Sequence, residues 1–184
     1  ANVEYSVNGE PLDYEPMLLS GVTALEGASY CAAYGYMSDY VIAYNVQLKA
    51  GVNEISMKLI SADAGPNIDA LKIRTSAELE WTPVKNGEAP IAYYGYEVFE
   101  HQEGEPYVFE AENADLSKVL NRDGESGDAV ESWVGIDHGD DELNKSHSCS
   151  NGWAAKNLNE RENNTISWVI YNNSEEAQAT LVLR

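Results

Sequence analysis

Seven short runs of alternating apolar and polar residues constrain the fold more than any other feature of the sequence. They cover residues 3–7, 40–48, 54–60, 70–74, 107–112, 165–171 and 179–183. Successive side chains of a strand point to opposite faces, so a period of two predicts strands that are buried on one face. No helical stripe is longer than about two turns. We therefore expect an all-β fold, an antiparallel β-sandwich of two packed sheets.

Turn residues separate these runs and leave two long stretches without a clear pattern. Asn8-Gly9 and Ala50-Gly51 are typical of tight turns between strands. Residues 75–106 combine prolines, acidic residues and a tyrosine-rich patch, which predicts a connector with room for one short hairpin. Residues 121–152 are rich in Asp, Glu, Gly, Ser and Asn, which predicts a long loop system. Long ordered loops on a sandwich commonly carry binding sites.

The negative charge of the chain limits the classes of partner that it can bind. Its 184 residues, enough for one well-packed domain, carry 11 basic and 31 acidic side chains, for a formal net charge of −20. Such a field repels phosphate backbones and anionic lipids, so we expect neither a nucleic acid nor a membrane as partner. No apolar run approaches the roughly 18 residues of a membrane helix, and no leader-like segment opens the chain. We expect a soluble, secreted protein.

The cysteines and the most acidic loop give no metal-binding pattern by themselves. Cys31 and Cys149 could form a disulfide or remain two buried thiols, and both alternatives stay open. The acidic segment 137–142 lacks the spacing of a self-contained calcium loop, so we expect solvated acid there rather than a second calcium ion. The three histidines share no ligand spacing and are expected at the surface.

Motifs in the second half of the chain resemble the start of a known family. YVFEAENADLS (107–117), SCSNGWAAKNLNE (148–160) and TISWVIYNNSEEAQATLVLR (165–184) follow one another in this order. They are similar to the opening half of carbohydrate-binding modules of families 6 and 35, which begin with an E-A-E strand, pass through a Ser-Gly-Gly turn and continue into two strands. Lys156 stands where that turn usually has glycine.

Motifs in the first half resemble the end of the same modules. NVEYSVNG (2–9), YNVQLKAGVNEISMKL (44–59) and GPNIDALKI (65–73) carry this likeness. Because the closing motifs come first, the resemblance implies a circularly permuted jelly roll of the galactose-binding-like type. The chain would be opened between the strand ending in LVLR and the strand beginning with NVEYSVNG, which the family joins by a short hairpin.

The resemblance implies a single module over residues 1–184. Residues 1–74 would be the closing half of the usual order, 75–106 the connector between the old termini, and 107–184 the opening half. Permutation leaves the core contacts intact when the cut and the new join lie at exposed turns. A second arrangement stays open, in which the chain straddles two tandem modules and forms a domain-swapped dimer.

The E-A-E motif indicates a metal site. If residues 107–112 form one strand, Glu110 and Glu112 project to the same face, and two buried like charges need a cation. The alternative is that both face solvent on an edge strand. The resemblance favours a structural calcium ion and implies these ligands: Glu110, Glu112, Asp69 and a backbone carbonyl near Asn151 to Trp153.

Aromatic rings and amides supply the candidate sugar-binding surface, because flat rings contact the apolar faces of pyranoses. The resemblance implies a site in the loops at one edge of the sandwich. The candidates are Trp153, Asn157, Asn67, Tyr30, Tyr34 and Tyr36. The tyrosines could instead pack under a long loop. Trp168, within the run ISWVIY, is expected in the core or on the opposite sheet face.

The function that the resemblance implies is non-catalytic binding of plant cell-wall polysaccharide. Xylan, mannan and uronic-acid-containing glycans are the expected ligand classes, and the module would tether a glycan-degrading enzyme or assembly to them. A glycosidase needs two carboxylates at a set separation in a cleft, and no pair stands out among the 31 acids, so we expect no enzyme. The remaining alternative is a structural or adhesion module that keeps calcium but does not bind sugar.

Overall fold

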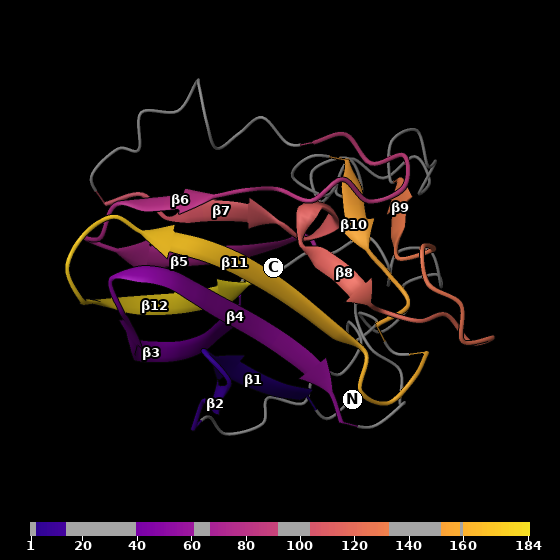
Figure 1. Cartoon of the computed structure of the whole chain (residues 1–184), viewed down its shortest axis with the longest axis horizontal. Coiled ribbons are helices and arrows are strands. Elements are labelled where there is room, and N and C mark those ends of the chain that lie inside the picture. The colour runs from indigo at the N-terminus through magenta and orange to yellow at the C-terminus, as the bar shows by residue number, and fades with distance from the viewer. Residues whose placement is uncertain (1–2, 14–39, 61–66, 92–103, 133–151, 159) are drawn as a thin grey trace, which may run out of the picture.

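Strands account for nearly all regular structure in the computed structural model, which describes residues 3–13, 40–60, 67–91, 104–132, 152–158 and 160–184 (Figure 1). The all-β prediction is confirmed, because these residues contain one 3₁₀ turn and no α-helix. No helix in the described ranges is long and apolar enough to cross a membrane. The elements are β1 (Val3–Val7), β2 (Glu10–Pro11), β3 (Tyr40–Leu48), β4 (Gly51–Leu59), β5 (Ala70–Thr75), β6 (Leu79–Trp81), β7 (Tyr107–Glu110), the 3₁₀ turn η2 (Ala111–Asn113), β8 (Asp115–Lys118), β9 (Val130–Ser132), β10 (Trp153–Ala155), β11 (Thr165–Asn172) and β12 (Ala177–Leu183).

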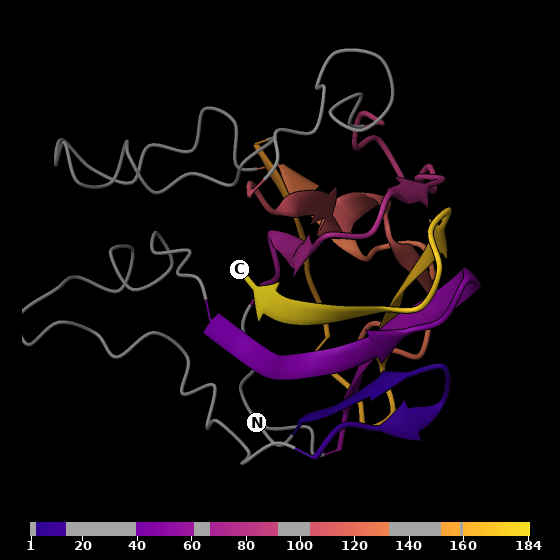
Figure 2. The same ribbon diagram turned by 90° about the vertical axis from the view of Figure 1, so that its left-hand side faces the viewer.

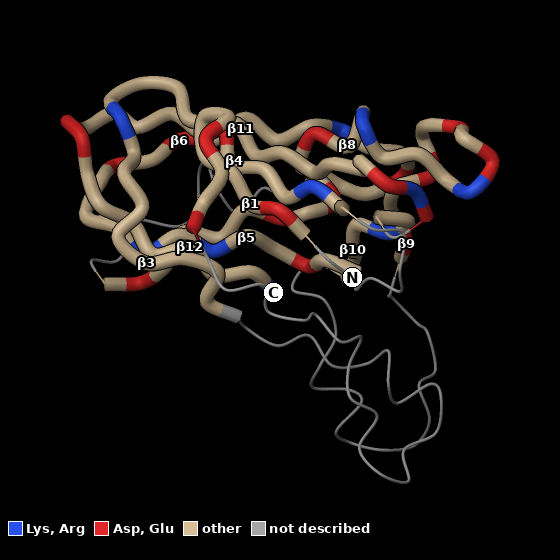
Figure 3. Tube along the Cα trace, turned by 90° about the horizontal axis from the view of Figure 1, so that it is seen from below, with Lys and Arg blue, Asp and Glu red and all other residues tan. Residues whose placement is uncertain are grey.

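The strands form two layers and a short ribbon. The first layer, sheet A, has the order β2-β1-β4-β11-β6, with β8 also paired to β11. The second layer, sheet B, has the order β3-β12-β5-β7, and all of these pairs are antiparallel. Figure 3 shows the two layers from below, with the β9–β10 ribbon at one end. This agrees with the predicted sandwich of antiparallel sheets.

Alternation along the central strands fills the space between the layers. On β4, Ile55, Met57 and Leu59 are buried while Glu54 is exposed, as the period of two predicts. Trp168 on β11 is 1% exposed, so its assignment to the core is confirmed. Full burial of such side chains stabilises the fold by about 1.5–3 kcal/mol each, which makes this interior the main source of stability.

The two halves of the chain share both sheets. In sheet A, β4 from the first half pairs with β11 from the second half along its whole length. In sheet B, β12 lies between β3 and β5, as Figure 2 also shows for β3 and β12, and β5 pairs with β7. The core of the described sandwich is therefore built by residues from both halves.

The junction between LVLR and NVEYSVNG differs from the expected hairpin. β12 lies in sheet B and pairs with β3 and β5, whereas β1 lies in sheet A and pairs with β2 and β4. The two strands are therefore not hairpin partners. The tight turn expected at Asn8-Gly9 is present, because both residues have positive φ (55° and 81°) and Val7 pairs with Glu10.

The connector contributes a strand to the sandwich. Its described part contains β6, which pairs with β11 at the edge of sheet A rather than with another connector strand. Trp81 of β6 is 6% exposed and meets Phe109 of β7 edge to face, with ring centroids 5.4 Å apart. Tyr107 donates its hydroxyl hydrogen to the carbonyl of Ala77. Ala77, Leu79 and Trp81 therefore belong to the core rather than to a loose linker.

One end of the sandwich is closed by buried asparagines. Asn53 is 0% exposed, and its amide nitrogen donates to the carbonyls of Lys49 (2.8 Å) and Gly51 (3.0 Å). Its amide oxygen accepts from Lys49 N and Asn8 Nδ2. Asn172 donates to the same Lys49 carbonyl from β11. These amides join the β3–β4 turn to the neighbouring strands.

Several predicted features lie outside the described residues. They are Cys31, Cys149, the three histidines, the acidic segment 137–142, Asn151, and the tyrosines Tyr30, Tyr34 and Tyr36.

Candidate functional site: a buried acidic cluster

Three carboxylates that the sequence singled out are buried. Asp69 and Glu112 are 0% exposed and Glu110 is 3% exposed. The alternative in which the glutamates face solvent is therefore wrong, although β7 is indeed an edge strand of sheet B. Burying a carboxylate costs several kcal/mol unless a cation or hydrogen bonds compensate for it, so each of these three buried side chains requires partners.

The expectation that residues 107–112 form one strand is wrong at its end. β7 stops at Glu110, and Ala111–Asn113 form the 3₁₀ turn η2. Ala111 N still donates to the carbonyl of Asp69 (2.8 Å), and Ala114 N closes the turn on the carbonyl of Ala111. Glu110 and Glu112 are therefore buried by different local structures, not by alternation along a strand.

Backbone contacts bring the elements of the predicted metal site together. Besides the bond from Ala111 N to the Asp69 carbonyl, Ile68 and Ala155 form an antiparallel bridge. Because the bridge is antiparallel, the residue after Ile68 lies opposite the residue before Ala155. Asp69 is therefore opposite Ala154, which is the neighbour of Trp153 in the chain. β10 also contacts η2. The segments that carry Asp69, Glu110, Glu112 and Trp153 thus meet at one end of sheet B.

The side chains themselves are not gathered as a metal centre. In the described part of the chain, no three His, Cys, Asp or Glu side chains form a group that could hold a metal ion. Asp69 Oδ2 instead lies 3.3 Å from Nε of Arg184. The chemistry of the donors fits calcium, which binds carboxylate and carbonyl oxygens, but a shared ion would require these carboxylates to turn toward one point.

The connector braces the turn that carries Glu112. Asn86 donates its amide to the carbonyls of Glu112 (2.9 Å) and Ala114 (2.7 Å). In return, Asn113 donates its amide to the carbonyls of Val84 (3.3 Å) and Pro90 (3.0 Å), and Val84 N donates to the carbonyl of Asn113. Asn113 is 0% exposed. Residues 84–90 and η2 therefore hold each other through five hydrogen bonds.

The candidate sugar-binding residues occupy the β9–β10 ribbon and its flank. Trp153 is half-buried on β10, opposite Ser132 of β9. Asn67 donates its amide to Oε1 of Glu131 in β9, and it precedes the bridge at Ile68. These contacts bring Asn67 to the same ribbon as Trp153.

Asn157 lies at the far end of this ribbon and has a structural role. It has a positive φ of 62° and donates its amide to the carbonyl of Asp128. Lys156, in the place of the usual glycine, forms an ion pair with Asp128 Oδ1 at 2.7 Å. Asn157 stands two residues beyond the end of β10, and its amide nitrogen is already engaged by the carbonyl of Asp128.

The connector also limits the space around the ribbon. A Cβ atom at Gly87 would lie 3.2 Å from Cγ2 of Val130 on β9. Val130 pairs with Ala155 and thus projects from the same face as Trp153, two residues along the ladder. Residues near Gly87 therefore partly cover the face of the ribbon from which Trp153 projects.

Sequence reasoning missed three residues of this region: Asn86, Glu131 and Arg184. Asn86 stands in a Lys-Asn-Gly-Glu context that is typical of a turn, and Glu131 in an acidic stretch expected to be loop. Arg184 carries no local signal at all, because its contact with Asp69 joins residues 115 positions apart (184 minus 69).

Comparisons with known proteins add no relative. No family model matches the chain, and neither the curated proteins nor the solved structures include a match.

Proposed function

We propose that this chain is a secreted, calcium-binding β-sandwich module that binds plant cell-wall polysaccharide and catalyses no reaction. The observation that carries the proposal is the burial of Asp69, Glu110 and Glu112 on backbone segments that contact one another. Two of these carboxylates come from one half of the chain and the third from the other. An ion held between them would stabilise the pairing of β5 with β7.

Calcium suits this donor set better than the other common biological cations. The described candidates are carboxylates and nearby carbonyls, which are hard oxygen ligands, and no described histidine or cysteine belongs to the cluster. Calcium tolerates irregular coordination by six to eight oxygens, whereas magnesium demands a near-ideal octahedron. The donor chemistry therefore favours calcium, provided that the carboxylates turn toward one point.

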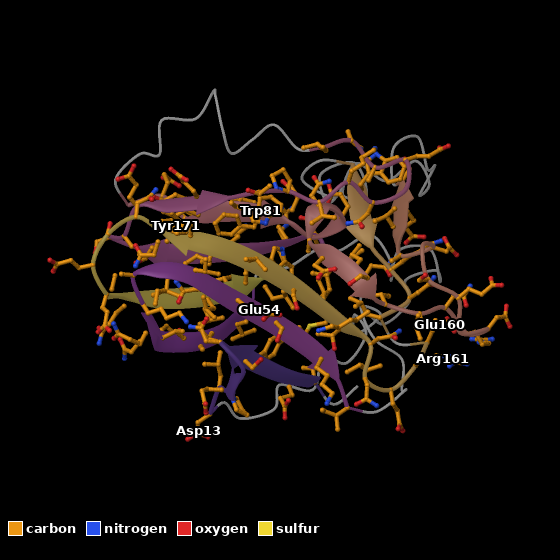
Figure 4. The ribbon with its side chains drawn as sticks, in the orientation of Figure 1. Asp13, Glu54, Trp81, Glu160, Arg161 and Tyr171 are labelled. Atoms are coloured by element: carbon orange, nitrogen blue, oxygen red, sulfur yellow. The ribbon has the colours of Figure 1, made fainter. Side chains whose placement is uncertain are left out.

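The metal proposal is tested by calorimetric titration of calcium into the chelator-treated chain, with thermal unfolding as a second readout. A ligand at 100 times its Kd stabilises the fold by about 2.7 kcal/mol. For a chain of this length such a gain raises Tm by about 5–10 °C. Glu112→Gln should abolish the effect. The matched control is Glu54→Gln on the outer face of β4, which Figure 4 shows in the middle of sheet A. A wild-type chain with no calcium response would refute the proposal.

The sugar-binding proposal rests on Trp153, which lies on β10, and on Asn67, which binds Glu131 of the neighbouring strand β9. An aromatic ring beside polar groups is a common way to bind a pyranose. Affinity electrophoresis through xylan, mannan, pectin and β-glucan tests it directly. We expect retardation by at least one glycan, lost in Trp153→Ala and reduced by chelator. The control is Tyr171→Ala. Its exposed ring lies at the end of sheet A that is farther from the β9–β10 ribbon, as Figure 4 shows.

A structural or adhesion module is the second candidate, and one observation favours it. The face of the ribbon that carries Trp153 is partly covered near Gly87 by the connector. If this cover leaves no ring accessible, the chain keeps its calcium site without binding sugar. Calcium binding together with no retardation by any glycan would establish this second function over the first.

A further inference from the structure

Arg184 is fixed by its backbone against the start of β5. Its N–H donates to the carbonyl of Ala70 (2.9 Å), and its own carbonyl accepts from Ala70 N (3.1 Å) and from Asp69 N (2.7 Å). This exchange of two hydrogen bonds makes Arg184 and Ala70 direct cross-strand neighbours. The position of Arg184 beside Asp69 is therefore set by the β12–β5 ladder, not by a flexible tail.

Pairing on the other side of Ala70 adds a second carboxylate. Ala70 is also the direct partner of Glu110 on β7. Arg184, Ala70 and Glu110 thus occupy one cross-strand row, and side chains in such a row project from the same face of the sheet. Ala70, which has a small side chain, is the middle residue of this row. Glu110 is therefore a second carboxylate on the same face of sheet B as Arg184.

The contact with Asp69 is an ion pair without a well-formed hydrogen bond. Nε of Arg184 lies 3.3 Å from Oδ2 of Asp69, whose side chain is 0% exposed, while the Arg184 side chain is 23% exposed. Oδ2 receives no aligned hydrogen bond. A partly exposed guanidinium can move into solvent at small cost, whereas the buried carboxylate cannot follow it.

We propose that Arg184 is an internal counter-ion that competes with a divalent cation for Asp69. This inference rests on the proposed calcium site and adds a regulatory residue to it. Two cations on the same carboxylate repel each other, so calcium can take Asp69 only when the guanidinium withdraws.

Competition has a signature that a supporting role does not have. Removing the charge should weaken the calcium-free fold, because Asp69 loses its counter-ion, and should strengthen calcium binding, because the competitor is gone. For charges about 4–5 Å apart near a protein surface, the repulsion is large enough to change affinity by about tenfold or more. A residue that merely supports the site would lower stability and affinity together.

The test measures calcium affinity by calorimetry and unfolding by urea in excess chelator for wild type, Arg184→Gln and Arg184→Lys. The control is Arg74→Gln on β5, the strand that begins at Ala70. This change removes an exposed charge about 13 Å from Ala70. We expect Arg184→Gln to bind calcium about tenfold more tightly yet unfold at lower urea. Arg184→Lys should stay near wild type in both readouts, and Arg74→Gln should match wild-type affinity.

The outcomes separate this inference from the proposed function. If wild type binds calcium and Arg184→Gln binds it equally or more weakly, Arg184 does not compete, and the calcium site itself stands. If Arg184→Gln binds calcium and wild type does not, the competition is supported, and the proposal that the wild-type chain binds calcium is refuted. If neither binds, the calcium site is refuted and the competition with it.

Discussion

The connector brace should make a measurable contribution to stability, and Asn86→Ala tests it. The substitution removes two hydrogen bonds, from Asn86 to the carbonyls of Glu112 and Ala114. Each such bond contributes about 1 kcal/mol net, and the abandoned carbonyls belong to a turn that is 0% exposed. We expect a loss of about 2 kcal/mol, which lowers Tm by about 4–8 °C in a chain of this length.

The assay is urea unfolding in excess chelator, followed by tryptophan fluorescence, so that calcium does not enter the measured free energy. Asn173→Ala is the matched control, because its side chain is exposed and its backbone bond to the Glu78 carbonyl survives the change. It should cost less than about 0.5 kcal/mol. Asn86→Asp tests whether the amide hydrogens matter apart from the size of the side chain. It keeps the side-chain volume, but it loses both hydrogen-bond donors and places a carboxylate against two carbonyls.

Two results would refute this reasoning. Equal stability of Asn86→Ala and Asn173→Ala would mean that the two hydrogen bonds of Asn86 do not help to hold residues 84–90 on η2. A stable Asn86→Asp would mean that the amide hydrogens do not matter. Hydrogen exchange gives an independent readout, since loss of the brace should first increase exchange of Val84 N, which donates to the Asn113 carbonyl.

Other expectations concern the rest of the molecule. Asn53→Ala should cost about 2–4 kcal/mol in urea unfolding, because four hydrogen bonds end on a side chain that is 0% exposed. The pKa of Asp115 is lowered by hydrogen bonds from Ser117 and by the charge of Lys118. A lowered carboxyl pKa contributes stability above its unfolded value near 3.9, and this stability is lost as pH falls through the folded value. Asp115→Asn should therefore be less stable than wild type at pH 7, by well under about 1 kcal/mol because the group is partly exposed, and the difference should vanish in acid. Light scattering of the chain at micromolar concentration should give the mass of one chain, and a dimer that persists on dilution would contradict this expectation and favour the domain-swapped arrangement.

The alternation of apolar and polar residues predicted most of the sandwich, because a strand that is buried on one face requires this pattern. Tyr40–Leu48 was expected with the bounds that β3 has, and the runs at 54–60 and 165–171 correspond to β4 and β11 within a few residues. Strands of three residues could not be found this way. β6, β9 and β10 are too short to show a period, and their pairing depends on partners far along the chain.

The acidic site was only partly accessible from sequence. Burial of Glu110 and Glu112 was expected from a motif resemblance, and both are buried. The expectation that both project from one face of a single strand is wrong, because Glu112 lies in the 3₁₀ turn after β7. Ala111 of this turn donates to the carbonyl of Asp69, 42 residues earlier (111 minus 69). The brace by Asn86 and the ion pair of Arg184 are equally non-local. Local patterns do not encode such contacts.

The described contacts also bear on whether the two halves come from one chain. Residues 79–81 pair with β11 and residues 84–90 hold η2, so the connector is already fixed on second-half elements before residue 92. An exchange between two chains would have to occur between residue 91 and β7, a span of about 15 residues that reaches at most about 50 Å. A tether of this length gives β7 an effective concentration near its partner β5 in the millimolar range. At micromolar chain concentrations the intramolecular pairing is then favoured by about a thousandfold, although both arrangements make the same described contacts. Local structure cannot distinguish the two, but tether length and mass action favour a sandwich closed within one chain.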